Sequence, residues 1–371
     1  MLAGIFAVIL MALWASAFVT NNPLTTYYGM TGWHSHEMIF GYATAVIAGF
    51  LLTAVRNWTE MKTPAGMPLA ALSALWLAGR IMPFFPDALP HWSVALVDLL
   101  FLPALALSLA IPLLRSRQKR NLFFIPLFGV FTLANLLVHL EVMGWADGFA
   151  RAGVFLGLDL IILLIVIMGG RVIPFFTARA LSGVSLRHWQ WVEWSSIASV
   201  IAFMLAELFL PASILVGVTA GLAAGSNGLR LIGWYTKKFW SVPLLWVLHL
   251  GYAWIVAGFC LKALAAVGLV PPQLTIHAFT VGGIGVLTLG MMARVSLGHT
   301  GRPLRVSKAV AFAFILINLA AAARGITPIF FLNGFPQLIA LSSGLWILSF
   351  AIFLEFYTPI LIRPRGDGRP G

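Results

Sequence analysis

Hydrophobic residues dominate this chain in runs of about 20, separated by short stretches that hold most of its charges. A run of that length crosses the hydrocarbon core of a bilayer as an α-helix. The pattern predicts twelve spans, near residues 2–19, 35–55, 67–82, 92–114, 121–142, 152–173, 191–210, 212–230, 242–268, 275–297, 306–324 and 335–361. Little more than Pro211 separates the seventh from the eighth, so a kinked or re-entrant segment is the alternative there.

Composition supports a membrane protein. Of 371 residues, 61% are hydrophobic and only 9% are charged, which leaves too little polar surface to cover a soluble globule. The sequence therefore predicts an all-α, polytopic membrane helix bundle, forming a single integral membrane domain over residues 1–371. No basic segment precedes the first run, so we expect Leu2–Val19 to be a retained span rather than a cleaved signal peptide.

The lysines and arginines predict the orientation, because cytoplasmic loops carry an excess of them. With both termini cytoplasmic, 19 of the 23 fall on the inner side, and the four left over are Arg80, Arg151, Lys262 and Arg324. The inner set is Arg56, Lys62, Arg115, Arg117, Lys119, Arg120, Arg171, Arg179, Arg187, Arg230, Lys237, Lys238, Arg294, Arg302, Arg305, Lys308, Arg363, Arg365 and Arg369. The net charge of +12 then reflects inner loops facing anionic membrane lipid, and it requires no nucleic-acid partner.

Several kinds of chemistry are excluded. The single cysteine, Cys260, rules out an intrachain disulfide framework and a thiolate-rich zinc or iron–sulfur site, and we expect it to be a small buried residue. The sequence has no Cys-x-x-Cys-His, so any haem is non-covalent and of b type. It also has no phosphate-binding glycine loop, nucleophile elbow or His-Glu-x-x-His.

The second run opens with an ionisable cluster, His34, His36 and Glu37. Such groups at the mouth of a membrane helix are expensive to desolvate, which favours a functional site. Residues two apart on a helix point about 200° from one another, so His34 and His36 cannot both coordinate one metal from a regular helix. His34 shares its face with Met38.

Further candidates lie on other spans. Asn135 and His139 share one face near the outer end of the fifth span, and His277 opens the tenth. With His34 and His36 these histidines fall at one outer depth, as a haem or metal between helices requires, whereas interhelical hydrogen bonds are the alternative.

His249 lies about a third of the way into the ninth span from the cytoplasm, where a histidine has few structural explanations. His299 stands in an inner loop and either ligates a metal or turns the chain. Arg80 and Arg324 end spans on the outer side, where they could hold haem propionates, while snorkelling or a structural pair is the alternative for Arg80. Three intramembrane acids, Asp98, Asp159 and Glu207, could form a proton route or accept structural hydrogen bonds.

Several motifs together resemble the NnrS family of bacterial membrane proteins, and the similarity covers nearly the whole chain. The motifs are Gly32–Gly41 (GWHSHEMIFG), Gly49–Ala54 (GFLLTA), Gly79–Arg80, Gly169–Thr177 (GGRVIPFFT), His249–Tyr252 (HLGY) and His277–Arg302. The resemblance implies a haem- and copper-containing protein of the bacterial inner membrane, associated with nitric oxide metabolism and tolerance. Nitric oxide or a related small molecule, and a quinol or another electron donor, are then its candidate partners. Which histidine holds which metal does not follow from the resemblance.

A more distant similarity is to the catalytic subunit of haem–copper oxidases and nitric oxide reductases. His34 and Met38 match a His-x-x-x-Met pattern that supplies a haem ligand there, and His277 falls where the opposite ligands lie. The adjacent His-His pair and the His-x-His of the oxidase binuclear centre are both missing, so reduction of oxygen or nitric oxide cannot be carried over.

The residues lead to one assignment and one competing function. His34 and His277 are predicted as axial ligands of one haem, and His249 as the best candidate for a second metal. His36 then binds copper with His139 or contacts Glu37. The competing function is a metal or small-solute transporter with a histidine-lined path; such a path should distribute its ligands along the passage, whereas most histidines here share one depth.

Overall fold

The computed structural model describes residues 1–116, 119–331 and 334–368; Arg117 and Arg369, both assigned above to the inner side, lie outside the described residues. Within this part of the chain the regular structure is helical and no strand occurs. Twelve helices among the described residues are long and apolar enough to cross a membrane. The all-α fold and the twelve spans are therefore confirmed, while the placement of both termini in the cytoplasm stays a prediction.

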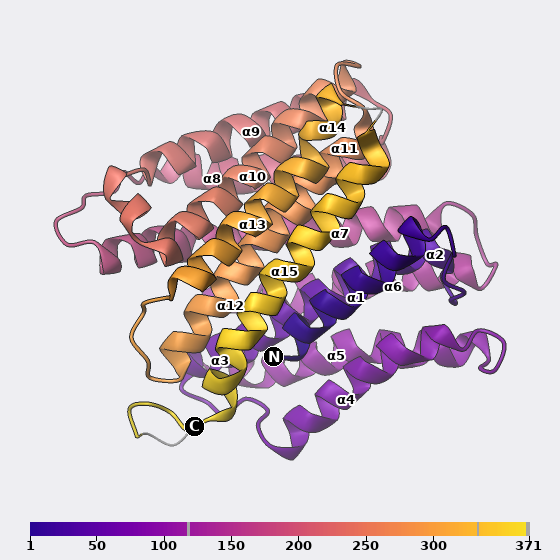
Figure 1. Cartoon of the computed structure of the whole chain (residues 1–371), viewed down its shortest axis with the longest axis horizontal. Helices are drawn as coiled ribbons and strands as arrows, with labels where there is room; N and C mark the ends of the chain where they lie inside the picture. Colours follow the sequence, from indigo (N-terminus) through magenta and orange to yellow (C-terminus); the bar gives the residue numbers. More distant parts are fainter. Residues whose placement is uncertain (117–118, 332–333, 369–371) are drawn as a thin grey trace. The chain divides into compact units, whose positions relative to one another are not determined.

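Most spans are single helices, and two contain a π-helix, a wider turn that is frequent at functional sites. The first three are α1 (Leu2–Val19), then α2 (Gly29–His36) with the π-helix η1 (Glu37–Ala43) and α3 (Thr44–Thr59), then α4 (Met67–Ile81) with η2 (Met82–Phe84). Next come α5 (His91–Arg115), η3 (Lys119–Asn121), α6 (Phe124–Val142), α7 (Phe149–Ala180), α8 (Gln190–Phe209), α9 (Ile214–Gly233), η4 (Lys237–Ser241) and α10 (Pro243–Ala266). The last are α11 (Pro272–His277) with the π-helix η5 (Ala278–Gly285) and α12 (Val286–His299), then α13 (Lys308–Gly325), α14 (Thr327–Phe330) and α15 (Phe335–Ile362) (Figure 1).

The stretch around Pro211 separates two full helices. α8 ends at Phe209, and α9 begins at Ile214 after Ser213, whose side chain accepts a hydrogen bond from the backbone N–H of Leu215. This is the usual N-cap of a helix. Both helices have the length of a span, as the twelve-span prediction requires.

The chain divides into two units, residues 16–160 and residues 1–15 with 161–371. In the first unit, α2, η1 and α3 pack beside α4, α5 and α6. Gly157 of α7 faces the ring of Phe40 so closely that a Cβ there would lie 2.8 Å from it, and Gly153 lies against the Ala134 carbonyl. These glycines let backbones approach, as small residues do between membrane helices. A single membrane domain stays a prediction.

The second unit is organised around a buried arginine. Arg230 of α9 pairs with Glu193 of α8, and its Nη1 donates to the Tyr252 hydroxyl at 3.0 Å and to the Val166 carbonyl at 2.7 Å. The guanidinium lies where Gly170 has no side chain. Gly170 therefore allows this close approach, because any Cβ there would overlap Arg230.

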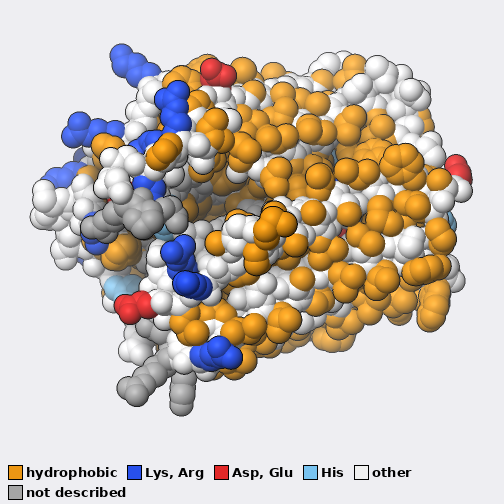
Figure 2. All heavy atoms as spheres, turned by 90° about the horizontal axis from the view of Figure 1, so that it is seen from below, with side chains coloured by type: hydrophobic (Ala, Val, Ile, Leu, Met, Phe, Trp, Pro, Cys, Tyr) orange, Lys and Arg blue, Asp and Glu red, His pale blue; other side chains and the backbone are white. Residues whose placement is uncertain are grey.

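The surface agrees with a membrane protein. Figure 2 shows a face made mostly of hydrophobic side chains, and many large apolar residues are exposed, among them Phe209, Ile232 and Leu222. Cys260 is exposed on α10, so its expected burial was wrong. A small apolar side chain needs no protein neighbour on a helix whose outer surface meets lipid.

We expect a reporter fused after Ser116 and one fused after Asp147 to lie on opposite sides of the membrane. The reason is that α6 forms one span between these points and the inner loops concentrate lysine and arginine. Alkaline phosphatase and fluorescent-protein fusions should report Ser116 inside and Asp147 outside. The same side for both fusions would contradict the topology.

Candidate metal centre

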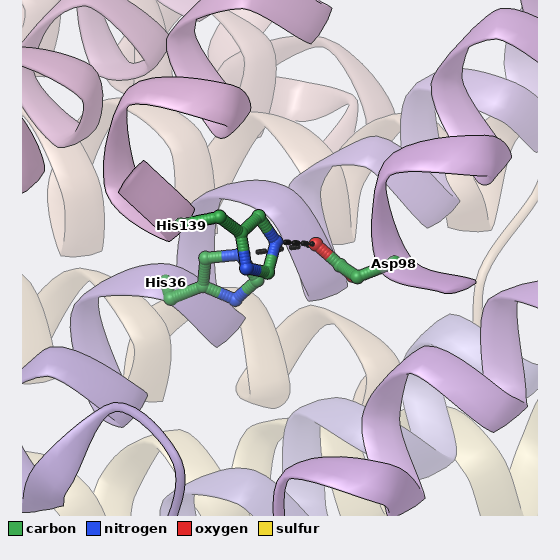
Figure 3. Close-up of side chains that lie close together, drawn as sticks. All are labelled: His36, Asp98 and His139. Carbon is green, nitrogen blue, oxygen red and sulfur yellow. Dashed lines mark hydrogen bonds and ion pairs between the residues drawn. The ribbon is translucent and has the colours of Figure 1, made fainter. Parts of the chain in front are cut away.

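Two histidines and an aspartate meet inside the first unit. His36 at the end of α2, Asp98 on α5 and His139 on α6 each offer one ligand atom, and the three atoms lie within 4.8 Å of one another (Figure 3). The two histidines are 0% exposed and Asp98 is 3% exposed. Imidazole nitrogen and carboxylate oxygen are ordinary ligands of transition metals.

The junction between α2 and η1 sets the direction of His36. His36 is the last α-helical residue, and the π-helix begins at Glu37. Both side chains are fully buried, whereas His34, two residues earlier, is partly exposed. The two histidines thus differ in burial, in line with the prediction that they point to different sides, and the direction of His34 stays a prediction.

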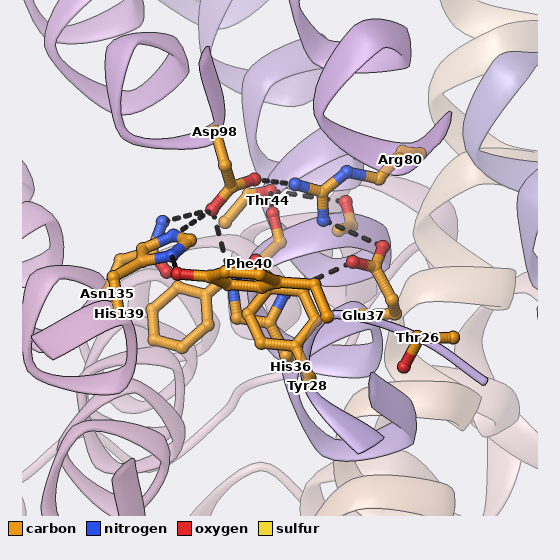
Figure 4. A network of polar contacts seen from close by, with 12 residues as sticks. Thr26, Tyr28, His36, Glu37, Phe40, Thr44, Arg80, Asp98, Asn135 and His139 are labelled. Atoms are coloured by element: carbon orange, nitrogen blue, oxygen red, sulfur yellow. Dashed lines mark hydrogen bonds and ion pairs between the residues drawn. The ribbon is translucent and has the colours of Figure 1, made fainter. Parts of the chain in front are cut away.

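A salt-bridged arginine anchors the cluster. The Nη1 of Arg80 donates to Glu37 Oε2 at 2.7 Å, and its Nη2 pairs with Asp98 Oδ1 (Figure 4). Gly79 makes room for this pair, since a Cβ there would lie 3.0 Å from Asp98 Oδ1. Of the alternatives for Arg80, the structural pair is present; its contact with a haem propionate stays a prediction.

Asp98 links the arginine to α6. Its Oδ2 accepts from Asn135 Nδ2 at 2.7 Å and from His139 Nε2 at 3.0 Å. Asn135 and His139 therefore act from one face of α6, as their spacing indicates. The Oδ1 of Asn135 lies 2.8 Å from His36 Nε2, while His36 Nδ1 donates to Glu37 Oε1 at 3.1 Å. Both predicted roles of His36, beside His139 and against Glu37, are thus compatible in one arrangement.

Two tyrosines from the loop before α2 cover the histidines. The Tyr28 ring stacks on His36 with centroids 4.1 Å apart, and the Tyr27 hydroxyl lies 3.3 Å from His139 Nδ1. The backbone N–H of Tyr27 donates to the Pro83 carbonyl at 2.8 Å, which fixes the loop. Burial raises the pKa of Tyr27 to about 12, so its hydroxyl stays protonated and donates to His139 Nδ1. His139 then carries its own proton on Nε2, toward Asp98.

The charges of the cluster favour a cation. Glu37 and Asp98 contribute two negative charges and Arg80 one positive charge, which leaves one negative charge when both imidazoles are neutral. With Nδ1–H donating to Glu37, the Nε2 lone pair of His36 faces two acceptors, Asn135 Oδ1 and, at 3.2 Å, Asp98 Oδ2, and one hydroxyl that can donate, that of Tyr28 at 3.2 Å. A positive centre at that point, either a proton or a metal ion, turns this repulsion into attraction.

The distances also fit a metal ion. Ligand atoms about 2.0–2.1 Å from a first-row metal lie roughly 3.3–3.6 Å from one another in tetrahedral or trigonal geometry. Asp98 Oδ2 is 3.0 Å from His139 Nε2 and 3.2 Å from His36 Nε2. Both separations that involve Asp98 are therefore within a few tenths of an ångström of those in a metal site, and the two histidine ligand atoms lie within 4.8 Å of each other.

The second unit contains the other predicted site residues. His249 is 3% exposed, donates from Nδ1 to the Leu245 carbonyl at 3.0 Å, and stacks on Phe239 with centroids 4.2 Å apart. Its Nε2 is buried and has no hydrogen-bond partner in the part of the chain that the structure describes. This is the tautomer that presents a metal-binding lone pair, so the second-metal assignment stays a prediction with support.

His277 and Arg324 are both partly exposed. The two residues stand on helices that touch at this point, because Gly325, the residue after Arg324, packs on the backbone of His277 and Ala278. The shared haem of His34 and His277 stays a prediction, since the two histidines belong to different units. His299 ends α12, and its carbonyl accepts from Arg365 Nη1 at 2.8 Å, which agrees with the turn-forming alternative.

Sequence reasoning missed the centre of the cluster. The sequence predicts Asp98 as an intramembrane acid but does not join it to His36 and His139, and it does not indicate that Tyr27 and Tyr28 cover the histidines. One usable signal existed: Arg80 and Asp98 both lie at the outer ends of adjacent spans, where an arginine and an acid are expected to pair.

Comparison with known proteins gives one match. The chain matches the model of the NnrS family, described as NnrS protein, over residues 1–365. A search of curated proteins finds no match.

We expect Arg80→Ala to destabilise the protein by about 3–5 kcal/mol, because it leaves two buried carboxylates without their counter-charge. Thermal unfolding of the purified protein in detergent should show a large drop in Tm. The matched control is Arg56→Ala, which removes an exposed arginine of α3. Equal Tm values for the two variants would contradict the anchoring role.

Proposed function

The chain belongs to the NnrS family, and from that premise we propose that it is a haem- and copper-binding protein of the bacterial inner membrane. Its proposed role is in nitric oxide metabolism or tolerance of nitrosative stress. The observation that carries the proposal is the buried group of His36, Asp98 and His139. Nitric oxide or a related small molecule, membrane lipid, and a quinol or other electron donor are its proposed partners.

We assign copper to the buried group. Two imidazole nitrogens and one carboxylate oxygen suit a copper ion, and the single negative charge of the cluster attracts a cation. Copper held there would supply one-electron redox chemistry and a position for a small ligand. The residues around it would orient the ligands: Glu37 accepts from His36 Nδ1, and when His139 Nε2 binds the copper its proton would lie on Nδ1 and be donated to the Tyr27 hydroxyl.

Two features of the second unit support bound cofactors, a haem and a second metal. Among the described residues, neither the buried Arg324 Nη1 nor the buried His249 Nε2 has a hydrogen-bond partner. A cationic donor suits a propionate, and an imidazole nitrogen with its other nitrogen bonded to a backbone carbonyl suits a metal. Haem b would supply an iron that binds nitric oxide. We retain His34 and His277 as its axial ligands and His249 as the second-metal candidate.

The buried group favours a resident metal over a transport path. A transporter distributes ligands along its passage, whereas His36, Asp98 and His139 converge on one fully buried point under two tyrosines. We therefore propose the haem–copper protein as the principal function.

We expect His36→Ala, His139→Ala and Asp98→Asn each to lose most of the bound copper, because each removes one of three ligands. Copper per protein is measured by mass spectrometry after purification from copper-supplemented cells, with the spectrum of Cu(II) as a second readout. The control is His188→Ala, whose side chain is 60% exposed. Copper retained in all three variants at the control level would refute the assignment.

We expect His34→Ala and His277→Ala each to lose or shift the haem signal. A pyridine haemochrome assay and low-temperature absorption spectra report haem content and ligation. His249→Ala is examined alongside: if it alone abolishes the haem signal, His249 rather than the predicted pair is the ligand. Wild-type protein without stoichiometric haem, expressed with ample haem, would rule out the haem protein.

A further inference from the structure

The second and tenth spans share one construction. In each, an α-helix ends at a histidine, His36 or His277, and a π-helix starts at the next residue. Each histidine is followed five residues later by a glycine inside the π-helix, Gly41 or Gly282. A further glycine follows thirteen residues after each histidine, and the next span-forming helix has an arginine, Arg80 or Arg324, as its penultimate residue. Two spans in different units thus share the same local arrangement of a histidine, a π-helix and glycines.

The two arginines differ in their counter-charges. Arg80 pairs with Glu37, the residue after His36, and with Asp98. The residue after His277 is Ala278, and the sequence contains no aspartate or glutamate from residue 208 to residue 354. The acid of α15, Glu355, lies about 30 Å along the helix from Phe335, which stacks under Arg324. No acidic side chain of that region can therefore neutralise Arg324.

The environment of Arg324 is partly closed. Its Nη1 is buried without a hydrogen-bond partner among the described residues, and its guanidinium lies 4.9 Å from the centroid of the Phe335 ring. The following Gly325 packs against the start of η5, where a Cβ would come within 3.1 Å of the Ala278 nitrogen. The guanidinium is thus held by a ring and by tight backbone packing, with one donor left unused.

A partly buried guanidinium without an acid calls for an anion from outside the chain, because an unpaired charge with a buried, unsatisfied donor is costly. The planar donor fork of arginine matches the two oxygens of a carboxylate or a similar oxyanion. We propose that Arg324 anchors a carboxylate or comparable small oxyanion beside the His277–Ala278 junction. The source is either a propionate of the haem, in which case the inference rests on the proposed function, or a free anion, in which case it does not.

The test uses full-length purified protein and one matched control. Arg324→Gln removes the charge, and Arg151→Gln removes another outer-end arginine that stacks on a phenylalanine, Phe155, at 5.2 Å but is exposed. The first arm measures Tm of haem-free protein in sodium acetate, sodium nitrite or sodium chloride at equal ionic strength. The second arm measures haem per protein by pyridine haemochrome after expression with ample haem.

Each outcome decides the matter. If acetate or nitrite raises Tm of the wild type and of Arg151→Gln but not of Arg324→Gln, while haem content is the same in all three proteins, the ligand is a free oxyanion. If haem content falls at least about tenfold in Arg324→Gln alone, the ligand is a propionate. If Arg324→Gln matches Arg151→Gln in both arms, the proposal is overturned. If the wild-type protein contains no haem, only the proposed haem function is refuted, because the Tm measurements in acetate and nitrite still test Arg324.

A second variant guards against an indirect effect. Ala278→Glu places a carboxylate at the position that Glu37 occupies in the other span, directly after the histidine. We expect it to neutralise Arg324 internally and to abolish the same signal as Arg324→Gln while the arginine remains. Retention of the anion or haem signal in folded Ala278→Glu protein would contradict the proposal that the Arg324 guanidinium binds the anion.

Discussion

The ion pairs of Arg80 with Glu37 and Asp98 are the constraint on which the first unit depends. Charges in an apolar bundle are tolerated only when they are paired and hydrogen-bonded, so η1, α4 and α5 must keep the positions that bring these three groups together. Asp98 extends the requirement to α6, because the same carboxylate accepts from Asn135 and His139. The helices are thus held in register by polar contacts that lipid-like packing alone would not specify.

This requirement also presents the ligand atoms. Nothing in hydrophobic packing selects the direction of a histidine, whereas Glu37 and Tyr27 each bind one ring nitrogen and leave the other directed at Asp98. A buried polar network usually contributes more to conformational specificity than to net stability. The network around His36 is therefore better understood as a device that positions a site than as a stabilising core.

Much of the fold was predictable, because membrane spans follow from the length of apolar runs and the sequence leaves little else to bury. The opposition of His34 and His36 and the pairing of Asn135 with His139 followed from helical periodicity. The convergence of Asp98 with both histidines did not, because its partners lie on other helices and no sequence spacing encodes that contact. The π-helices were also unforeseen, since a single extra residue in a turn leaves no mark in hydrophobic pattern. The expectation that Cys260 is buried was wrong, because apolar membrane helices face lipid as readily as protein.

The comparison of the two π-helical spans shows how one local geometry can serve opposite charges. In both spans a histidine precedes the wide turn and an arginine ends the next span-forming helix. Two acids turn the first arrangement into a cluster with one surplus negative charge, which selects a cation. The sequence from residue 208 to residue 354, which includes Arg324, contains no aspartate or glutamate. The same construction therefore carries a surplus positive charge there and selects an anion. The ligand preference of each span therefore follows from the acids around its arginine, while the shared helical geometry fixes only where that ligand is presented.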